Sequence, residues 1–173
     1  MVEPPDPSYR VEPLSRDHDR SRFSCGNSQL DEYLREFVHQ DRKRYATAAY
    51  VLVRERDAAV YGYYTLSSLS IDPGELPEET IKQLPRYPAI PATLLGRLAL
   101  DQSCQGKGLG EFLLLHALDL SLSQADKIGA AAVVVDAIND AASRFYQHFG
   151  FIPFPDHPDR LFIPMKTINQ LPL

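Results

Sequence analysis

The sequence predicts an α/β or α+β fold in which one sheet has a parallel crossover in its second half. Strand-like and helix-like patterns follow one another in the order strand, helix, two strands, strand, helix, strand, helix, strand. The segment AAAVVVDAI at 130–138 is almost entirely apolar, which is typical of a strand buried on both faces. With 173 residues, 44% of them apolar, the chain is long enough for one core, so we expect a single domain over residues 1–173.

The first predicted elements are a short strand and an amphipathic helix. Residues 1–8 are polar and rich in proline, so we expect a flexible lead-in to a strand around 9–14. Segment 28–40 has apolar residues at the i, i+3, i+4, i+7 and i+8 positions of one helical face, namely Leu30, Tyr33, Leu34, Phe37 and Val38. Ser28 and Asp31 form a capping pattern at its start, and we expect this helix to pack on the core.

The remaining elements alternate between strands and helices. Residues 47–71 hold two β-rich runs broken at 54–58, which predicts an antiparallel hairpin. Residues 72–91 contain five prolines and a helical pattern at 78–84, so we expect a surface connection. The later patterns predict a strand at 92–100, a helix at 110–129, the buried strand at 130–138, a helix at 139–151 that Gly150 ends, and an edge strand at 161–168.

The net charge of the chain indicates which classes of partner it is expected to bind. A net charge of −5 argues against a nucleic-acid partner, because neutralising phosphates dominates the free energy of such binding. The charge is uneven, since residues 1–56 hold ten basic and ten acidic residues and residues 57–173 hold eight basic and thirteen acidic ones. Basic clusters can therefore exist within the acidic chain.

Composition also suggests a compartment. The sequence has no secretion-signal pattern and no apolar stretch of roughly 18 residues, so we expect a cytoplasmic protein. Cys25 and Cys104 are then expected to be reduced thiols rather than a disulfide. Too few His, Cys, Asp and Glu residues cluster to suggest a metal site.

The stretch QGKGLG at 105–110 places three glycines at every second position before an apolar helical pattern. A Walker loop would need Ser or Thr after Lys107, where Gly108 stands, and a dinucleotide fingerprint would need its last glycine two residues further along. Two interpretations remain from the residues alone. The loop either presents bare amides and the positive end of a helix dipole to an anion, or only turns the chain from strand to helix.

Two motifs favour the first interpretation, because they resemble a known family. Gln105, Gly108 and Gly110 match the (Gln/Arg)-x-x-Gly-x-(Gly/Ala) signature of the GNAT acetyltransferase superfamily, and NDAASRFYQHFGF at 139–151 resembles its Asn…(Phe/Leu)-Tyr…Gly-Phe segment. The resemblance implies the GNAT fold, with a mixed sheet of about six to seven strands flanked by helices. It also implies acetyl coenzyme A (acetyl-CoA) as co-substrate, without a metal.

The same resemblance implies which residues contact the coenzyme. Loop amides would hold the pyrophosphate, and N–H groups of a splayed strand would polarise the thioester carbonyl. Asn139 would either touch the cofactor arm or only cap its helix. The implied cofactor-binding residues are Leu98, Ala99, Leu100, Gln105, Gly106, Lys107, Gly108, Leu109, Gly110 and Asn139.

Four longer phrases narrow the resemblance. FSCGNSQLDEYL, LLGRLALD, VVVDAINDAASRFYQHFGF and DRLFIPMKTI together resemble the GNAT toxins of bacterial type II toxin–antitoxin modules. This resemblance implies a translation-inhibiting toxin that acetylates the α-amino group of aminoacyl-tRNA, with a ribbon-helix-helix antitoxin as partner. Whether the protein forms a homodimer stays open.

Tyr146 is the expected general acid. A phenol with a pKa of about 10 is protonated at pH 7 and can give a proton to a thiolate whose thiol has a pKa near about 8.5. In the resembling family a tyrosine at this position has that role. The alternative is an aromatic that only packs, but Phe145, Phe149 and Phe151 can supply that packing.

The acceptor can be inferred from pKa values. No general base stands out among His116, His148, Asp101 and Asp136. An α-amine with a pKa near about 8 is neutral in roughly a tenth of molecules at pH 7, whereas a lysine near about 10.4 is neutral in about one part in a few thousand. An α-amine is therefore the favoured acceptor, and it does not require a base.

Four basic residues are candidates for binding tRNA. Arg42 and Lys43 end the first helix, where the alternative is a solvated run of cations that stabilises the helix dipole. Arg97 interrupts an apolar strand, so we expect it to need a carboxylate or phosphate partner. Arg86, beside Tyr87 in the proline-rich connection, would add a phosphate contact.

Two other functions stay open. A GNAT acetyltransferase of a protein N-terminus or a small amine would use Arg97 to bind a carboxylate. A non-catalytic coenzyme A-binding regulatory module would need no proton donor, so Tyr146 argues against it.

Overall fold

The computed structural model describes all 173 residues, and seven strands form one sheet in the order β1-β2-β3-β4-β5-β7-β6. The strands are β1 (Tyr9–Pro13), β2 (Ala48–Arg54), β3 (Val60–Ile71), β4 (Ile90–Leu100), β5 (Ala132–Asp136), β6 (Ile152–Pro153) and β7 (Arg160–Pro164). The helices are α1 (Ser28–Glu32), the π-helix η1 (Tyr33–Phe37), α2 (Val38–Lys43), the 3-10 turn η2 (Pro73–Glu75), α3 (Glu78–Ile81), the 3-10 turn η3 (Gln102–Cys104), α4 (Leu109–Ala125), α5 (Asp140–His148) and α6 (Met165–Ile168). The predicted mixed sheet flanked by helices is confirmed.

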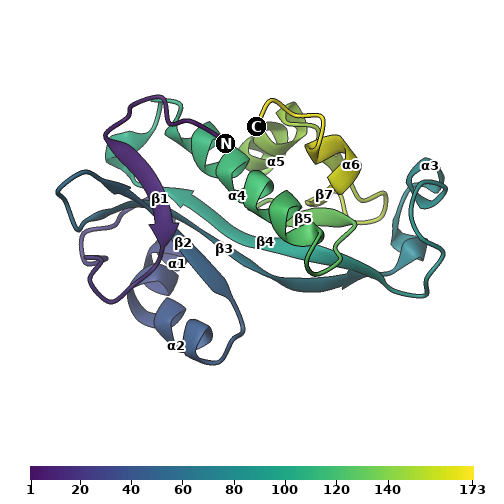
Figure 1. The fold of residues 1–173 in the computed structure, drawn as a ribbon, viewed down its shortest axis with the longest axis horizontal. Helices are drawn as coiled ribbons and strands as arrows, with labels where there is room; N and C mark the ends of the chain where they lie inside the picture. Colours follow the sequence, from purple (N-terminus) through teal and green to yellow (C-terminus); the bar gives the residue numbers. More distant parts are fainter. The chain divides into compact units, whose positions relative to one another are not determined.

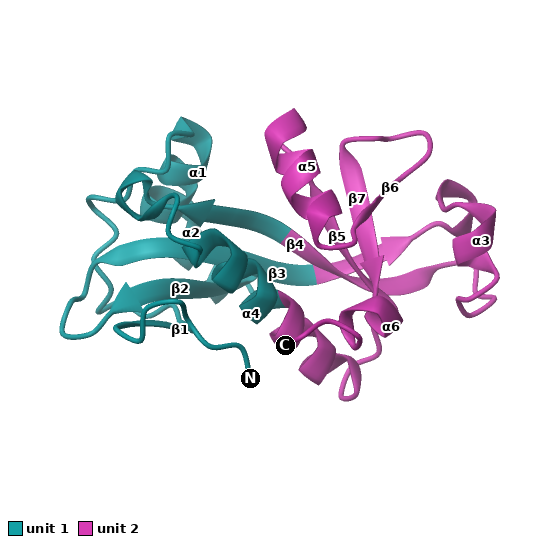
Figure 2. Ribbon diagram, turned by 90° about the horizontal axis from the view of Figure 1, so that it is seen from above, with its two compact units in different colours: residues 1–67, 96–117, 173 teal, residues 68–95, 118–172 magenta.

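The chain forms two compact units, which are coloured separately in Figure 2. Unit 1 comprises residues 1–67, 96–117 and 173, and unit 2 comprises residues 68–95 and 118–172. The single domain over residues 1–173 and the flexible lead-in at 1–8 stay predictions. None of the helices is both long and apolar enough to cross a lipid bilayer.

Unit 1 is built on the antiparallel strands β1, β2 and β3, which lie side by side in Figure 1. Because successive side chains of a strand point to opposite faces, Tyr63 joins the core under α1, η1 and α2, while Gly62 faces Leu113 of α4. The helices α1 to α2 and the helix α4 therefore cover opposite faces of these strands (Figure 1). Cys25 and Cys104 are free thiols, as the sequence predicted.

The helix predicted at 28–40 contains a π-turn, and this changes one core assignment. Phe37 was expected on the apolar face but is 46% exposed, whereas Val38 is fully buried. The π-turn adds one residue to a helical turn, so it rotates the residues after it relative to a regular 3.6-residue pattern. The start also differs, because Asn27 rather than Ser28 is the N-cap and accepts a hydrogen bond from Leu30 N–H at 3.1 Å.

Unit 2 contains the parallel strand pair that the sequence predicted. β5 pairs in parallel with β4 over Thr93–Leu95 and antiparallel with β7, and its residues Val133–Val135 are at most 1% exposed. The edge strand predicted at 161–168 is wrong in two respects. β7 lies between β5 and β6, and the chain turns into the short helix α6 at Met165. The edge strand beside β7 is β6, which has two residues, too few for a recognisable period.

Gly62 is a position where the fold depends on a missing side chain. A Cβ atom there would lie 3.1 Å from Ala99 O, 3.1 Å from a Leu100 methyl and 3.2 Å from a Leu113 methyl. We expect Gly62→Ala to lower the free energy of unfolding by about 1 to 3 kcal/mol, because a strand and a helix must both move. Gly129→Ala is the matched control, since nothing lies within 4 Å of its Cβ position. Equal effects of the two substitutions in denaturant unfolding would contradict this expectation.

Candidate active site

Two of the three loop glycines are required by the backbone. Gly106 and Gly108 both have a φ of +75°, a conformation that L side chains rarely adopt. Gly110 has no such φ and lies in the first turn of α4, where nothing is within 4 Å of its Cβ position. The missing side chain of Gly110 therefore keeps the backbone accessible to a ligand and is not needed to avoid backbone strain.

The loop presents a row of backbone amides that have no acceptor. None of the six N–H groups of residues 106–111 donates a hydrogen bond within the chain, and the first to do so is Phe112 N–H, which donates to Gly108 O at 3.1 Å. The loop residues 105–108 are exposed. These amides begin a helix of 17 residues, so its positive dipole end adds to their field. The arrangement can bind an anion with several oxygens, such as a phosphate or pyrophosphate.

Side chains on both sides fix the start of this loop. The Gln105 amide donates to Cys25 O at 3.3 Å and to Leu100 O at 3.4 Å, so this predicted cofactor residue braces the loop against the end of β4. The Asp101 carboxylate accepts from Ser24 N–H at 3.0 Å. Partial burial raises the pKa of Asp101, but the hydrogen bonds from Ser24 and the following turn outweigh it and hold the pKa below its usual value.

The end of β4 has an unpaired edge. Pairing with β5 ends at Leu95, and β4 continues for residues 96–100 without a further β5 partner. Leu98, Ala99 and Leu100, the predicted carbonyl-polarising residues, all lie in this extension. An open strand edge can pair with an extended ligand that contains amide groups, which is the property that the sequence could not show.

Arg97 has an aromatic partner. Its Cζ atom lies 3.4 Å from the centroid of the Tyr33 ring, and that ring stacks on Tyr63 at 6.5 Å with an interplanar angle of 19°. Within the chain an aromatic face, rather than a carboxylate, thus contacts the guanidinium, and a phosphate partner for Arg97 stays a prediction. Burial, followed by a 2.9 Å hydrogen bond to Asp41, raises the pKa of Tyr33 to about 12, while Arg97 acts in the opposite direction.

The other predicted tRNA-binding residues lie in different compact units, and their role stays a prediction. Arg42 is half-buried and Lys43 exposed at the end of α2 in unit 1, and Arg86 is exposed in unit 2. Lys43 lines a hollow of about 470 Å³ together with Arg16, Arg20, His39 and Gln40. Sequence reasoning missed Arg16, Arg20 and His39, because they form no linear motif with Lys43. Arg16 and Arg20 are far from Lys43 in the sequence, and His39 is one helical turn before it.

In unit 2, α5 carries Tyr146 and is capped by Asn139. The Asn139 side chain accepts from Ala142 N–H at 2.8 Å, so the capping role is observed, and its cofactor role stays a prediction. The Tyr146 ring packs on Phe145 and Phe151, each at 5.4 Å between centroids, and burial raises the pKa of Tyr146 to about 12. The Tyr146 ring therefore packs like an ordinary core aromatic, but this packing does not account for its hydroxyl.

The Tyr146 hydroxyl reaches the surface without a partner. It makes no hydrogen bond within the chain, although Tyr146 is only 8% exposed. No fully buried side-chain nitrogen or oxygen in the protein lacks a hydrogen-bond partner. The hydroxyl must therefore keep some exposure, which leaves its proton available to a ligand.

Three of the four groups considered as a general base already hold hydrogen bonds, and the fourth, His148, is exposed on α5. Asp136 accepts two hydrogen bonds from Arg160, at 2.8 and 2.9 Å, and Asp101 holds the turn before the glycine loop. His116 Nδ1 lies 3.0 Å from the Tyr64 hydroxyl. No group of three or more His, Cys, Asp or Glu side chains is arranged to hold a metal ion.

Comparisons with known proteins agree with this arrangement. A family model described as an acetyltransferase (GNAT) domain matches residues 47–153. A tRNA-acetylating toxin of Mycobacterium tuberculosis is 35% identical over 158 residues, covering 91% of this chain and 93% of the relative. The structure of AtaT complexed with acetyl-methionyl-tRNAfMet has a TM-score of 0.86 and 34% identity, covering 93% of this chain and 97% of AtaT.

A second AtaT structure adds two further ligands. It is a tyrosine-to-phenylalanine mutant of that toxin bound to acetyl-CoA and to the C-terminus of the antitoxin AtaR. Its TM-score is 0.79 at 32% identity, with 93% of this chain and 96% of that chain covered. The family match spans more than half of the chain, and the similarity to toxins extends over nearly all of it. The chain belongs to the GNAT acetyltransferase family and is similar to its tRNA-acetylating toxins.

Proposed function

We propose that this protein transfers the acetyl group of acetyl-CoA to the α-amino group of aminoacyl-tRNA and thereby acts as the translation-inhibiting toxin of a toxin–antitoxin module. The observation that carries the proposal is the row of acceptor-free amides at residues 106–111, in a chain similar over nearly its full length to tRNA-acetylating toxins. The substrate is charged in the cytoplasm, so the enzyme acts there. Its partner is an antitoxin, which we assign to the ribbon-helix-helix class.

The residues of the loop fit the coenzyme. The amides of residues 106–110 can donate to the pyrophosphate oxygens, and the absence of a Cβ at Gly110 lets those oxygens approach. The exposed side chain of Lys107 adds a cation at the same loop. Backbone groups of Leu98 to Leu100 pair with the amide-containing arm and polarise the carbonyl. The coenzyme supplies the acetyl group as an activated thioester.

Tyr146 supplies the proton that the leaving thiolate takes up. As the C–N bond forms and the C–S bond breaks, the phenol gives its proton to sulfur and later recovers one from solvent. A pKa of about 12 keeps Tyr146 protonated throughout the physiological range. Burial also raises the pKa of a thiol held beside it, so transfer is less unfavourable than the two solution pKa values suggest.

The α-amino group attacks as the fraction that is already neutral. Its proton leaves to water, because the neutral amine needs no base and three of the four candidate bases, Asp101, Asp136 and His116, hold hydrogen bonds of their own. Arg97 lies on the same strand as the carbonyl-polarising residues and is fixed by Tyr33. A fixed guanidinium there is positioned to bind a phosphate near the 3′ end of the tRNA.

Transfer of a labelled acetyl group tests the proposal. Total aminoacyl-tRNA incubated with the protein and labelled acetyl-CoA should yield labelled N-acetyl amino acids once the ester bond is hydrolysed. Deacylated tRNA is the control and should take up no label. Label found only on protein N-termini or on small amines would overturn the proposed substrate.

Removing the Tyr146 hydroxyl tests the proton donor. We expect Tyr146→Phe to lower kcat by about 10² to 10⁴-fold. Because the hydroxyl has no partner in the chain, the free energy of unfolding should change by no more than about 0.5 kcal/mol, and the Kd for acetyl-CoA should stay within about twofold. Tyr87→Phe is the matched control, since Tyr87 is 62% exposed and has no assigned role in the transfer chemistry. Normal turnover by Tyr146→Phe would refute the assignment.

The pH dependence of the reaction follows from the pKa values of the α-amine and of Tyr146. Raising the pH deprotonates the α-amine, so kcat/KM should increase until the pH exceeds the amine pKa of about 8. Activity needs the protonated phenol and should fall only as the pH rises through the Tyr146 pKa of about 12. Single-turnover rates, which outpace ester hydrolysis, should therefore reach a plateau without a decline up to about pH 10. A decline between pH 8 and 10 that is absent from Tyr146→Phe would contradict the raised pKa.

A further inference from the structure

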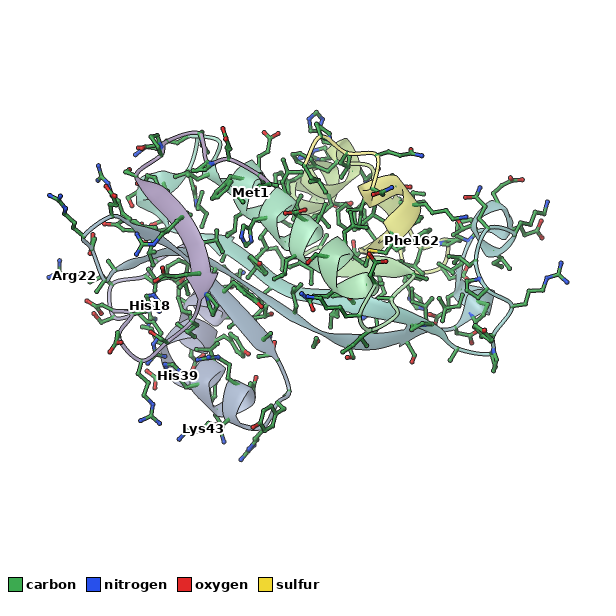
Figure 3. All side chains as sticks on the ribbon, viewed as in Figure 1. Met1, His18, Arg22, His39, Lys43 and Phe162 are labelled. Atoms are coloured by element: carbon green, nitrogen blue, oxygen red, sulfur yellow. The ribbon has the colours of Figure 1, made fainter.

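A basic hollow lies in unit 1 beside α2. It has a volume of about 470 Å³ and is lined by Arg16, Arg20, His39, Gln40 and Lys43. His39 and Lys43 are one helical turn apart and share one face of α2, where Figure 3 shows both. The assigned roles of the glycine loop, Arg97 and Tyr146 make no use of Arg16, Arg20 or His39.

Arg20 is fixed within this hollow by the π-turn. Its Nη1 donates to Leu34 O at 2.8 Å and to Arg35 O at 2.9 Å, both in η1. The remaining nitrogens of the guanidinium, Nε and Nη2, have no partner within the chain. An arginine held in this way loses little side-chain entropy when those nitrogens bind a ligand.

No Asp or Glu side chain lines the hollow. A second hollow differs in this respect, because Glu32 and Glu36 line it together with Arg35. Asp41 is close in sequence, but its carboxylate accepts the hydrogen bond of the Tyr33 hydroxyl. The hollow therefore concentrates positive charge in a chain whose net charge is −5.

The cations around the hollow affect the pKa of His39. Partial burial lowers the pKa of His39, and the charges of Arg20, Arg42, Arg16 and Lys43 lower it further. These four are the charged groups that act on His39, two from the segment before α1 and two from α2. An anion in the hollow would offset them and would favour the protonated imidazole.

We propose that the hollow of Arg16, Arg20, His39 and Lys43 binds a backbone phosphate of the tRNA substrate, away from the acetyl-transfer chemistry. Its occupant is taken to be tRNA on the basis of the proposed function, while the affinity of the hollow for phosphate follows from its own charges. Two neighbouring features favour a nucleic acid over a small anion. The basic run Arg42 to Arg44 continues the positive surface, and Tyr45 directly after it is 96% exposed, so its ring can stack on a base.

A double substitution tests the proposal without disturbing Arg20. Arg16 and Lys43 are both exposed, so Arg16→Gln with Lys43→Gln should leave folding intact. We expect KM for aminoacyl-tRNA to rise at least about fivefold, and the slope of log(kcat/KM) against log salt to become shallower by about one unit, as for one lost phosphate contact. The Kd for acetyl-CoA should stay within about twofold of wild type.

The matched control removes the same number of charges elsewhere. Arg22 and Lys127 are exposed and do not line the hollow, and Figure 3 shows Arg22 at a separate edge of unit 1. Arg22→Gln with Lys127→Gln should change KM and the salt slope much less than the hollow variant does. Equal changes in the two variants would overturn the proposal, because net charge alone would then account for them. A loss of acetyl-CoA affinity in the hollow variant would also overturn it.

Titration of His39 by NMR separates this proposal from the proposed function. Deacylated tRNA at saturating concentration should raise the pKa of His39 towards its ordinary value, and coenzyme A should leave that pKa unchanged. Inorganic phosphate at millimolar concentration is the small-anion arm and should have a weaker effect than tRNA. If tRNA binds and the pKa of His39 does not move, or if coenzyme A moves it, the hollow is not a tRNA phosphate site. If tRNA moves the pKa but aminoacyl-tRNA is never acetylated, the hollow stands and the proposed reaction fails.

Discussion

The proposed chemistry depends on the backbone amides that open α4. The positive φ values of Gly106 and Gly108 turn the chain so that the amides of residues 106–111 find no acceptor inside the protein. Until a ligand arrives, only water can satisfy them, and the helix dipole favours negative charge at the same point. A phosphate-bearing acyl donor is the ligand that satisfies this constraint within a GNAT chain. In the proposed reaction, the position of the phosphates at this loop sets the position of the thioester along β4.

The π-turn η1 contacts two arginines of unit 1. Its first residue, Tyr33, is buried, and the Tyr33 ring lies against the Arg97 guanidinium and stacks on Tyr63. The π-turn also places two carbonyl oxygens within reach of Arg20, which fixes that side chain beside the hollow. Two arginines from different parts of the chain are therefore held rigidly by the same helical segment, one by a ring face and one by backbone oxygens. Rigid cations of this kind recognise phosphate with little loss of entropy.

Local patterns allowed much of the fold and the core of the site to be predicted. The element order, the parallel crossover and the GNAT family were recognisable because hydrophobic periods and the two motifs are local in sequence. The exposure of Phe37 could not be predicted, because the hydrophobic pattern of a sequence does not show where a helical turn contains one added residue. The Arg97 and Tyr33 contact and the hollow of Arg16, Arg20, His39 and Lys43 depend on long-range packing, which a single sequence does not encode visibly. The roles of Tyr146 and the loop residues stay predictions.

Amide spectra of the protein with and without coenzyme A test the central claim most directly. When the coenzyme binds, the backbone amide protons of residues 106–111 should move downfield and exchange more slowly with water, because each gains a charged acceptor. The amides of α5 are an internal reference for general effects of binding. Coenzyme A that binds and leaves the resonances of residues 106–111 in place would show that the glycine loop only turns the chain, and the proposed mechanism would be wrong.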